Sequence, residues 1–186
     1  MINLDDSLFI AKGEHRACYR HPDKNNLCIK VSFDSKSPEH KRELGYYKLL
    51  SKRNIGWDYL TRFHGMEQTN IGLGHLFDLV MDNNNQPSKT LEYYLKQGVP
   101  VGASQALLRL KSYLLKYSIV TKELNPKNIV CVNNGGNIEK AIIVDDIGNT
   151  EFLPISSYSS YFGRRKIHRK WRRFEEHLKQ KGLALK

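Results

Sequence analysis

Glu123 and Asn128 are two oxygen-bearing side chains that lie five residues apart in the stretch TKELNPKNIV, residues 121–130. Pro126 stands between them. Because proline lacks a backbone N–H and biases the preceding residue away from helical geometry, we expect a rigid loop here. Such a loop would present both side chains from one fixed turn. An ordinary connection between a helix and a strand explains the same residues, so the rest of the chain must distinguish the two interpretations.

Two short β-rich runs follow this loop, NIVCV at residues 128–132 and AIIVDD at residues 141–146. The polar cluster NNGGNIEK between them is typical of a hairpin connection. Since an antiparallel hairpin returns its exit beside its entrance, we expect Asn128 to lie near Asp146. Their oxygen atoms could together hold a divalent cation, with Glu123 close by.

KELNPKNIV and IIVDDIGN resemble the catalytic loop and the metal-binding turn of the protein-kinase-like superfamily. The resemblance implies that Glu123 acts on the acceptor hydroxyl, and that Asn128 and Asp146 hold the metal. We prefer Asp146 to Asp145 because Gly148, two residues after Asp146, completes the expected turn.

The N-terminal half extends this resemblance to the nucleotide site. Lys30 in LCIKV corresponds to the strand lysine that holds the nucleotide phosphates, and Glu43 in the following helix corresponds to its ion-pair partner. The implied catalytic residues are therefore Glu123, Lys30 and Glu43. The implied nucleotide-binding residues are Gly13, Arg16, Lys30, Val80 and Met81, the last two in a hinge that also contains Leu79.

GEHRACYRHP, NPKNIV and VDDIGN resemble YrbL, a family of small bacterial kinase-like proteins connected with the PhoP regulatory network, and the likeness covers residues 7–175. It implies an ATP-dependent phosphotransferase with ATP and Mg²⁺ as cofactors. About 38 residues follow Gly148, too few for the helical lobe that binds peptides in protein kinases. We therefore expect a small molecule or a glycolipid as the acceptor rather than a peptide.

Some residues depart from the kinase pattern. Gly13 is the one glycine where a glycine-rich loop has three, and His15 and Arg16 stand in the turn. Arg16 either supplies a cation in place of the lost backbone contacts or is exposed on a mobile loop. Glu123 is one methylene longer than the usual Asp. A nucleotide-binding pseudokinase, a regulatory scaffold that acts through partners, and a basic surface-binding protein are the alternative functions.

The elements needed to position these residues can be read from the sequence. Strands are expected over residues 7–11, 27–33, 61–69 and 73–82, with a loop over residues 12–26. Helices are expected over residues 37–53, with Ser37 as N-cap, and over residues 89–95 and 103–117. The prediction is an α+β, reduced kinase-like bilobal fold. Residues 1–82 form its sheet-plus-helix lobe, residues 83–162 a truncated, mainly helical lobe with the catalytic hairpin, and residues 163–186 a basic C-terminal helix.

The net charge of +11 is concentrated in residues 163–186, which hold ten Lys or Arg against two Glu. Ile167, Trp171, Phe174 and Leu178 form an apolar stripe there at helical spacing. We expect a helix docked on the protein; an amphipathic helix on an anionic membrane or glycolipid is the first alternative and a nucleic-acid arm the second. Zinc-finger spacing and an aromatic RNA-binding signature are both absent, which disfavours nucleic acid.

The chain contains 186 residues, of which 40% are hydrophobic, and this suffices for a buried core. The sequence has no apolar run long enough for a membrane span, and the start MINLDDSLFI does not resemble a signal peptide. The three cysteines predict neither a disulfide framework nor a zinc site. We expect a cytoplasmic protein, with peripheral attachment to the inner membrane face as an alternative, and the oligomeric state stays open.

Overall fold

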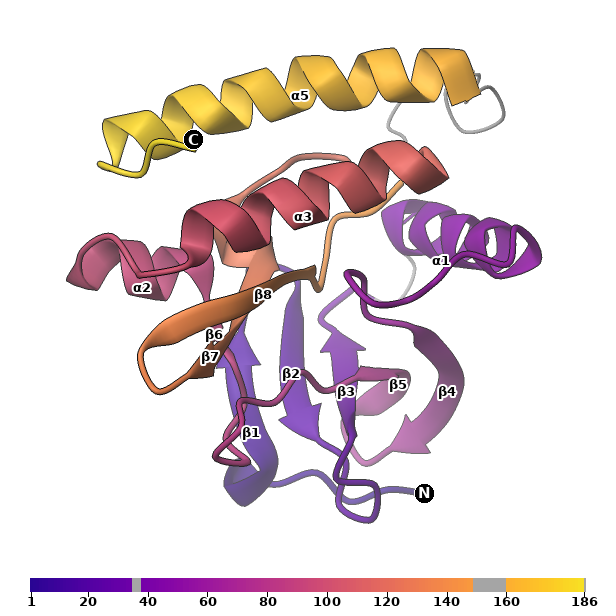
Figure 1. The fold of residues 1–186 in the computed structure, drawn as a ribbon. Coiled ribbons are helices and arrows are strands. Elements are labelled where there is room, and N and C mark those ends of the chain that lie inside the picture. Colours follow the sequence, from indigo (N-terminus) through magenta and orange to yellow (C-terminus); the bar gives the residue numbers. More distant parts are fainter. Residues whose placement is uncertain (35–37, 149–159, 186) are drawn as a thin grey trace.

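A five-stranded antiparallel sheet forms the N-terminal part of the computed structural model, which describes residues 1–34, 38–148 and 160–185 of an α+β protein (Figure 1). The strand order is β1-β2-β3-β5-β4. The strands are β1 (Phe9–Lys12), β2 (Arg16–Arg20), β3 (Leu27–Ser32), β4 (Phe63–Thr69) and β5 (Gly72–Asp78), and a short 3-10 helix, η1 (Asp6–Leu8), precedes β1. The predicted antiparallel sheet is confirmed.

Strand β2 corrects the prediction of a loop over residues 12–26. It pairs with β1 on one side and with β3 on the other, with Ala17 opposite Val31. The segment is short and polar at both ends, and Pro22 and Asp23 follow it closely, so the local pattern resembles a turn. Pairing along both of its edges makes this segment a strand, and that pairing depends on residues distant in the sequence.

Helix α1 (Pro38–Lys52) packs against the five-stranded sheet. Tyr47 and Leu50 are fully buried, and the Tyr47 ring centroid lies 5.2 Å from that of Phe77 on β5. Burial of these aromatic and aliphatic side chains fixes the helix on the sheet and thereby fixes Glu43, one turn before Tyr47, beside β2 and β3. Ser37, the predicted N-cap, lies outside the described residues.

The second half contains a three-stranded sheet in the order β6-β7-β8, from β6 (Lys89–Thr90), β7 (Ile129–Asn134) and β8 (Asn137–Ile143). Helix α3 (Ala103–Tyr117) occupies the predicted segment, whereas α2 (Leu91–Gln97) begins two residues later than the predicted 89–95, because Lys89 and Thr90 pair with β7 as β6. The hairpin turn is shorter than predicted: Gly135 and Gly136, both with positive φ, form it, and β8 begins at Asn137 because Ile138 is buried. Strand β8 ends at Ile143, so the two aspartates that follow lie in a loop.

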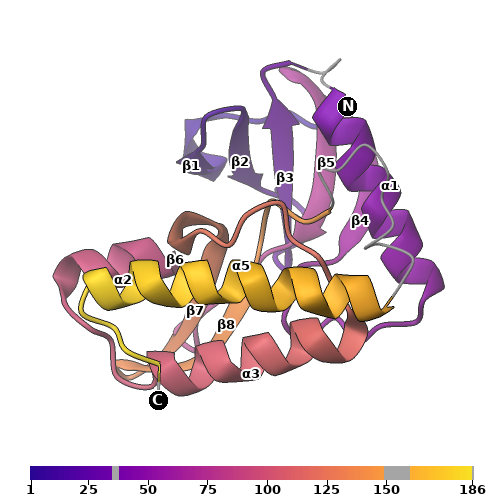
Figure 2. The same cartoon turned by 90° about the horizontal axis from the view of Figure 1, so that it is seen from above.

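Helix α5 (Ser160–Gln180) lies beside α3, at the end of the molecule opposite the five-stranded sheet (Figures 1 and 2). Its apolar stripe is buried, with Trp171 and Leu178 fully so. The expected docked helix is confirmed, although it begins three residues before residue 163. The stripe belongs to the main hydrophobic cluster, which also includes Tyr47, Leu107 and Ile143. In the described part of the chain, no helix is long and apolar enough to cross a membrane.

Candidate functional site

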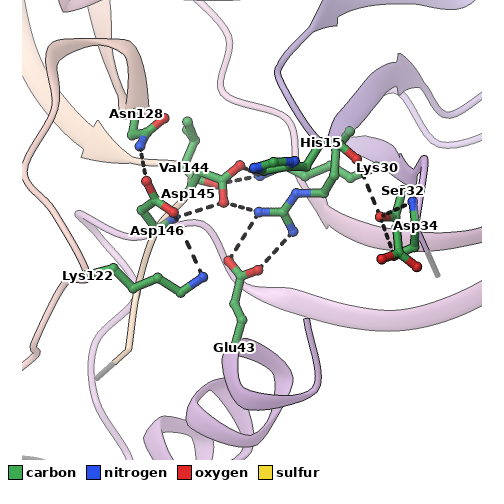
Figure 3. A network of polar contacts seen from close by, with 11 residues as sticks. His15, Lys30, Ser32, Asp34, Glu43, Lys122, Asn128, Val144, Asp145 and Asp146 are labelled. Atoms are coloured by element: carbon green, nitrogen blue, oxygen red, sulfur yellow. Dashed lines mark hydrogen bonds and ion pairs between the residues drawn. The ribbon is translucent and has the colours of Figure 1, made fainter. Parts of the chain in front are cut away.

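Two cations and two carboxylates meet between the sheet and helix α1: Arg16 on β2, Lys30 on β3, Glu43 on α1 and Asp145 after β8. The Arg16 guanidinium contacts both Glu43 oxygens, at 2.9 Å from Nη1 and 3.4 Å from Nη2, and Nη2 also binds Asp145 Oδ1. The Lys30 ammonium donates to the Val144 carbonyl and lies 3.7 Å from Asp145 Oδ2. Figure 3 shows Glu43, Lys30 and Asp145 converging from three elements.

Arg16 corrects two expectations. It is held on a strand with a side chain only 13% exposed, so it is not on an exposed mobile loop. It also takes Glu43 as its partner, and no contact within 4.0 Å joins Glu43 to Lys30 among the described residues. A planar guanidinium can contact both oxygens of one carboxylate while reaching a second, which an ammonium cannot do. Lys30 is instead placed over the Phe77 ring, 4.6 Å from its centroid, and points to Asp145.

Burial and pairing shift the pKa values of these groups in opposite directions. Burial raises the pKa of Glu43 above its ordinary value, and Arg16 only partly offsets this. Burial also disfavours the charged form of Asp145, but Lys30 and Arg16 outweigh it and lower its pKa to about 2. Burial disfavours the charged form of Arg16 as well, yet Asp145 and Glu43 raise its pKa. Asp145 and Arg16 are therefore firmly ionised at neutral pH.

A second polar group adjoins this cluster. Asn128 Nδ2 donates to Asp146 Oδ2 at 2.6 Å, and the Lys122 ammonium lies 4.0 Å from Asp146 Oδ1 (Figure 3). The contact between Asn128 and Asp146 is the one that the hairpin predicted. Burial and the neighbouring Asp145 raise the pKa of Asp146, while Lys122 opposes them. A cation bound here would relieve the repulsion between the two aspartates.

The backbone holds the two loops together. Lys122 N–H donates to the Asp146 carbonyl at 2.6 Å and Gly148 N–H to the Val120 carbonyl at 2.9 Å. Asp146 adopts a left-handed conformation with φ +60°, which turns its side chain out of the β8 direction. On the other loop, the 3-10 turn η2 (Pro126–Asn128) is capped by Asn125, as Pro126 predicted for a rigid loop. The positions of Asn128 and Asp146 thus follow from backbone bonds.

The donor set fits Mg²⁺ at Asp146 and Asn128. Both Asp145 oxygens already face cations, since Oδ1 contacts Arg16 and Oδ2 faces Lys30. Among the described residues, Asp146 Oδ1 has only the more distant Lys122 ammonium, at 4.0 Å, and rotation of the Asn128 amide would place its oxygen beside Asp146 Oδ2. Within the described ranges no group of three or more His, Cys, Asp or Glu could hold a metal. Mg²⁺ commonly takes one or two protein oxygens and completes its shell with phosphates and water.

Glu123 lies in the loop between α3 and β7, next to Lys122. Its side chain is exposed and borders a cavity of about 350 Å³ between the loop and helix α5. No hydrogen bond or ion pair joins Glu123 to another residue that the structure describes. Its assignment as the acceptor base stays a prediction.

The remaining predicted nucleotide residues are Gly13, in the turn between β1 and β2, and Val80 and Met81, which follow β5. Gly13 N–H donates to the Arg16 carbonyl at 2.8 Å and closes the β1–β2 turn. The Val80 carbonyl accepts from Ser88 N–H at 2.9 Å, and Met81 bridges to Pro87. One of the hinge groups expected to face an adenine is therefore already occupied.

Sequence reasoning missed the central position of Asp145, which binds both cations of the cluster. The signal was present in the Asp145–Asp146 pair, but which aspartate turns toward Lys30 depends on the left-handed backbone at Asp146. Sequence reasoning also missed Lys122 as a neighbour of Asp146. Lys122 lies in a loop without helical or strand periodicity, so the sequence pattern does not predict where its side chain points.

Fold and site together define an α+β protein in which an antiparallel sheet, one helix and a hairpin assemble a buried charge cluster beside an Asn–Asp pair. The chain belongs to the family described as PhoP regulatory network protein YrbL, which its sequence matches over residues 2–179. It is 33% identical over 192 aligned residues to YrbL of Escherichia coli (strain K12). The alignment covers 100% of this chain and 90% of that protein. YrbL of Shigella flexneri is similar to the same extent.

Proposed function

We propose that the chain is an ATP-dependent, Mg²⁺-requiring phosphotransferase of the protein-kinase-like superfamily. The observation that carries the proposal is the meeting of Lys30 with the loop that follows β8, 114 residues further along the chain. This contact places a strand lysine beside two aspartates, and the second aspartate touches Asn128. Those four side chains are of the types that nucleotide and magnesium binding require.

The residues would divide the work by charge. Lys30 would bind nucleotide phosphate oxygens, and the Asp146 carboxylate with the Asn128 amide oxygen would hold Mg²⁺. Bound Mg²⁺ would neutralise charge on the transferring phosphoryl group. Arg16 and Glu43 would keep Asp145 fixed and ionised, so that Lys30 stays directed toward the same loop. Glu123, on the exposed face of the loop, would orient or deprotonate an acceptor hydroxyl.

The acceptor is proposed to be a small molecule or a glycolipid rather than a peptide. Residues after Gly148 supply helix α5, and this helix is packed into the core by Trp171 and its apolar neighbours. Helix α5 therefore stabilises the fold and does not form a separate peptide-binding lobe. The surface beside Glu123 suits a small acceptor.

A nucleotide-binding pseudokinase is the second candidate, and one observation favours it. Glu43 is engaged by Arg16 at 2.9 Å, so the Lys–Glu pair that orients the phosphate-binding lysine in active kinases has been replaced. Gly13 alone lines a turn that usually holds several glycines. A site whose Glu43 carboxylate is already paired with Arg16 could bind nucleotide without hydrolysing it or transferring its phosphate. The chain would then act as a regulatory scaffold that senses nucleotide.

Nucleotide binding is tested by thermal unfolding with ATP, with Mg·ATP and without either. A ligand that binds only the folded chain stabilises it by RT ln(1 + [L]/Kd), about 2.7 kcal/mol at a hundredfold excess over Kd. We expect the melting temperature to rise, more with Mg²⁺ than without. An unchanged melting temperature at millimolar ATP under both conditions would refute both candidate functions.

Turnover separates the enzyme from the pseudokinase. Single-turnover phosphate release from Mg·ATP should fall by on the order of 10² to 10⁴ in Glu123→Gln, the usual contribution of a positioned base, while nucleotide affinity stays unchanged. Glu123→Asp, which keeps the charge, should retain part of the rate. Binding without turnover by the wild-type chain would favour the pseudokinase, and turnover indifferent to Glu123→Gln would remove Glu123 from the mechanism.

A further inference from the structure

The cavity beside Glu123 is formed by two segments, the 122–126 loop and one face of α5. Its volume of about 350 Å³ lies within the range of sites for small ligands. The residues that line it are Lys122, Glu123, Leu124, Asn125, Pro126, Lys170, Arg173, Phe174 and His177. Phe174 is buried and forms part of the core. The cavity therefore has a rigid apolar floor and a polar, mainly cationic rim.

Lys122, Lys170 and Arg173 are the three cations that line this cavity together with one carboxylate, Glu123. Lys170 donates from its ammonium to the Lys122 carbonyl, which directs its charge toward the loop. Arg173 and His177 make no hydrogen bond or ion pair with any residue in the described ranges. Both residues are exposed, so the guanidinium of Arg173 and the ring of His177 can donate to an anionic ligand in the cavity.

The spacing of these residues along α5 explains why the cations gather. Lys166, Lys170, Arg173 and His177 follow one another at four, three and four residues, which places them on one helical face. That face borders the stripe of Ile167, Trp171, Phe174 and Leu178, which is packed into the core. Docking of the apolar stripe therefore sets the cationic face against the loop that carries Glu123.

Like charges crowd around Lys170. Its pKa is lowered by burial and by the nearby Lys166, while Glu123 acts in the opposite sense. Lys166 itself is only 7% exposed. Such crowding is unfavourable in the free protein and becomes favourable when an anion is bound.

We propose that this cavity binds the phosphoryl acceptor and that the acceptor is itself an anion, a phosphorylated compound with a free hydroxyl. Arg173 and Lys170 would hold its phosphate group, and His177 would donate a further hydrogen bond. The proposal rests on the proposed phosphotransferase function. It names the acceptor class, a phosphate group on a molecule with a free hydroxyl, which both a soluble sugar phosphate and the headgroup of an anionic lipid offer.

The position of Lys122 connects this cavity to the magnesium pair. Lys122 lines the cavity, and its ammonium lies 4.0 Å from Asp146 Oδ1. A hydroxyl of the bound acceptor would form a bond from its oxygen to the γ-phosphorus of ATP. The bond from that phosphorus to the β-phosphate oxygen would break to release ADP, and the hydroxyl proton would pass to Glu123.

Calorimetric titration of the full chain with inorganic phosphate and with glucose 6-phosphate tests the soluble source. Arg173→Gln should weaken binding by about ten- to a hundredfold, the effect of removing one charged hydrogen bond. Arg172→Gln is the matched control, because Arg172 has the same charge and exposure on the next position of α5 but does not line the cavity. It should bind as the wild type does.

Co-sedimentation with phosphatidylglycerol vesicles, against phosphatidylcholine vesicles, tests the lipid source with the same two variants. The proposal is supported if Arg173→Gln loses binding and Arg172→Gln keeps it. Binding of inorganic phosphate or glucose 6-phosphate would indicate a soluble acceptor, and binding of phosphatidylglycerol vesicles would indicate a lipid acceptor. Failure of all three probes to bind, or equal weakening by both variants, would overturn it.

Lys30→Met separates this inference from the proposed function. This variant should lose Mg·ATP binding and keep binding of inorganic phosphate, since Lys30 does not line the cavity. Loss of phosphate binding in Lys30→Met would show that the anion occupies the nucleotide site, and would overturn the acceptor cavity while leaving the nucleotide site intact.

Discussion

Arg16 and Glu43 form a two-point ion pair in which Nη1 lies 2.9 Å from Oε2 and Nη2 lies 3.4 Å from Oε1, with both side chains largely shielded from water. The pair joins β2 to α1 and closes the sheet side of the charge cluster. Breaking a buried ion pair at one end leaves the other charge without a partner, which costs more free energy than removing both ends together.

Arg16→Met should therefore lower the free energy of unfolding by about 3 to 5 kcal/mol. The double variant Arg16→Met with Glu43→Met should recover part of this loss, because no unpaired carboxylate remains at the Glu43 position. Arg20→Met, on the same strand, should change stability by no more than about 0.5 kcal/mol. Urea denaturation of these variants, of the single variant Glu43→Met and of the wild type measures the losses, and strictly additive losses in the double variant would contradict the coupling.

Lys30→Met and Asp146→Asn should affect nucleotide binding differently. Lys30→Met should weaken ATP binding with and without Mg²⁺, because it removes a cation that contacts phosphate. Asp146→Asn should abolish mainly the gain that Mg²⁺ provides, since it removes a charged oxygen ligand. Calorimetry with and without Mg²⁺ compares both variants with Lys127→Met, an exposed lysine of the same loop. Identical losses for the two site variants under both conditions would refute the division of roles.

Stability should fall in acid through Asp145. Its folded pKa of about 2 lies below its ordinary value of 3.8, so its ionised form stabilises the fold above pH 3.8, and this contribution is lost as the pH falls toward 2. The shift corresponds to on the order of 2 kcal/mol. Glu43 and Asp146, whose pKa values are raised, act in the opposite sense and stabilise the fold below their ordinary values.

The measurement is the difference in unfolding free energy between the wild type and Asp145→Asn from pH 6 to pH 2. That difference should shrink below about pH 4, because Asp145 becomes protonated first in the unfolded chain and only near pH 2 in the folded chain. If the difference stays constant over this range, the contribution of Asp145 to stability does not depend on its ionised form.

Trp171→Ala should destabilise the chain by about 3 to 5 kcal/mol, because Trp171 is fully buried between α5 and the core and leaves a cavity when truncated. Its indole N–H also donates to Glu175 at 2.8 Å. Arg172→Ala, its exposed neighbour, should be nearly neutral. Thermal unfolding in the absence of lipid compares the two variants. If Trp171→Ala leaves the melting temperature unchanged, packing of Trp171 does not hold α5 on the protein core.

The sequence by itself determined the elements whose signals are local. Helical periodicity located α1, α3 and the apolar stripe of α5, and the Asn–Gly cluster located the β7–β8 hairpin. The contact between Asn128 and Asp146 was predictable for the same reason, since the two residues are 18 positions apart and hairpin geometry alone brings them together.

Only the tertiary structure decided which charges pair. Arg16 reaches Glu43 across 27 residues and Asp145 across 129, and both contacts require β2, a strand whose short polar sequence resembles a loop. The partner of Glu43 was predicted as Lys30, but the guanidinium fork satisfies two carboxylates at once and so takes that position. The amphipathic pattern of α5 likewise permitted several partners; burial of Trp171 in the protein core selected one, since an apolar stripe gains its free energy wherever it leaves water.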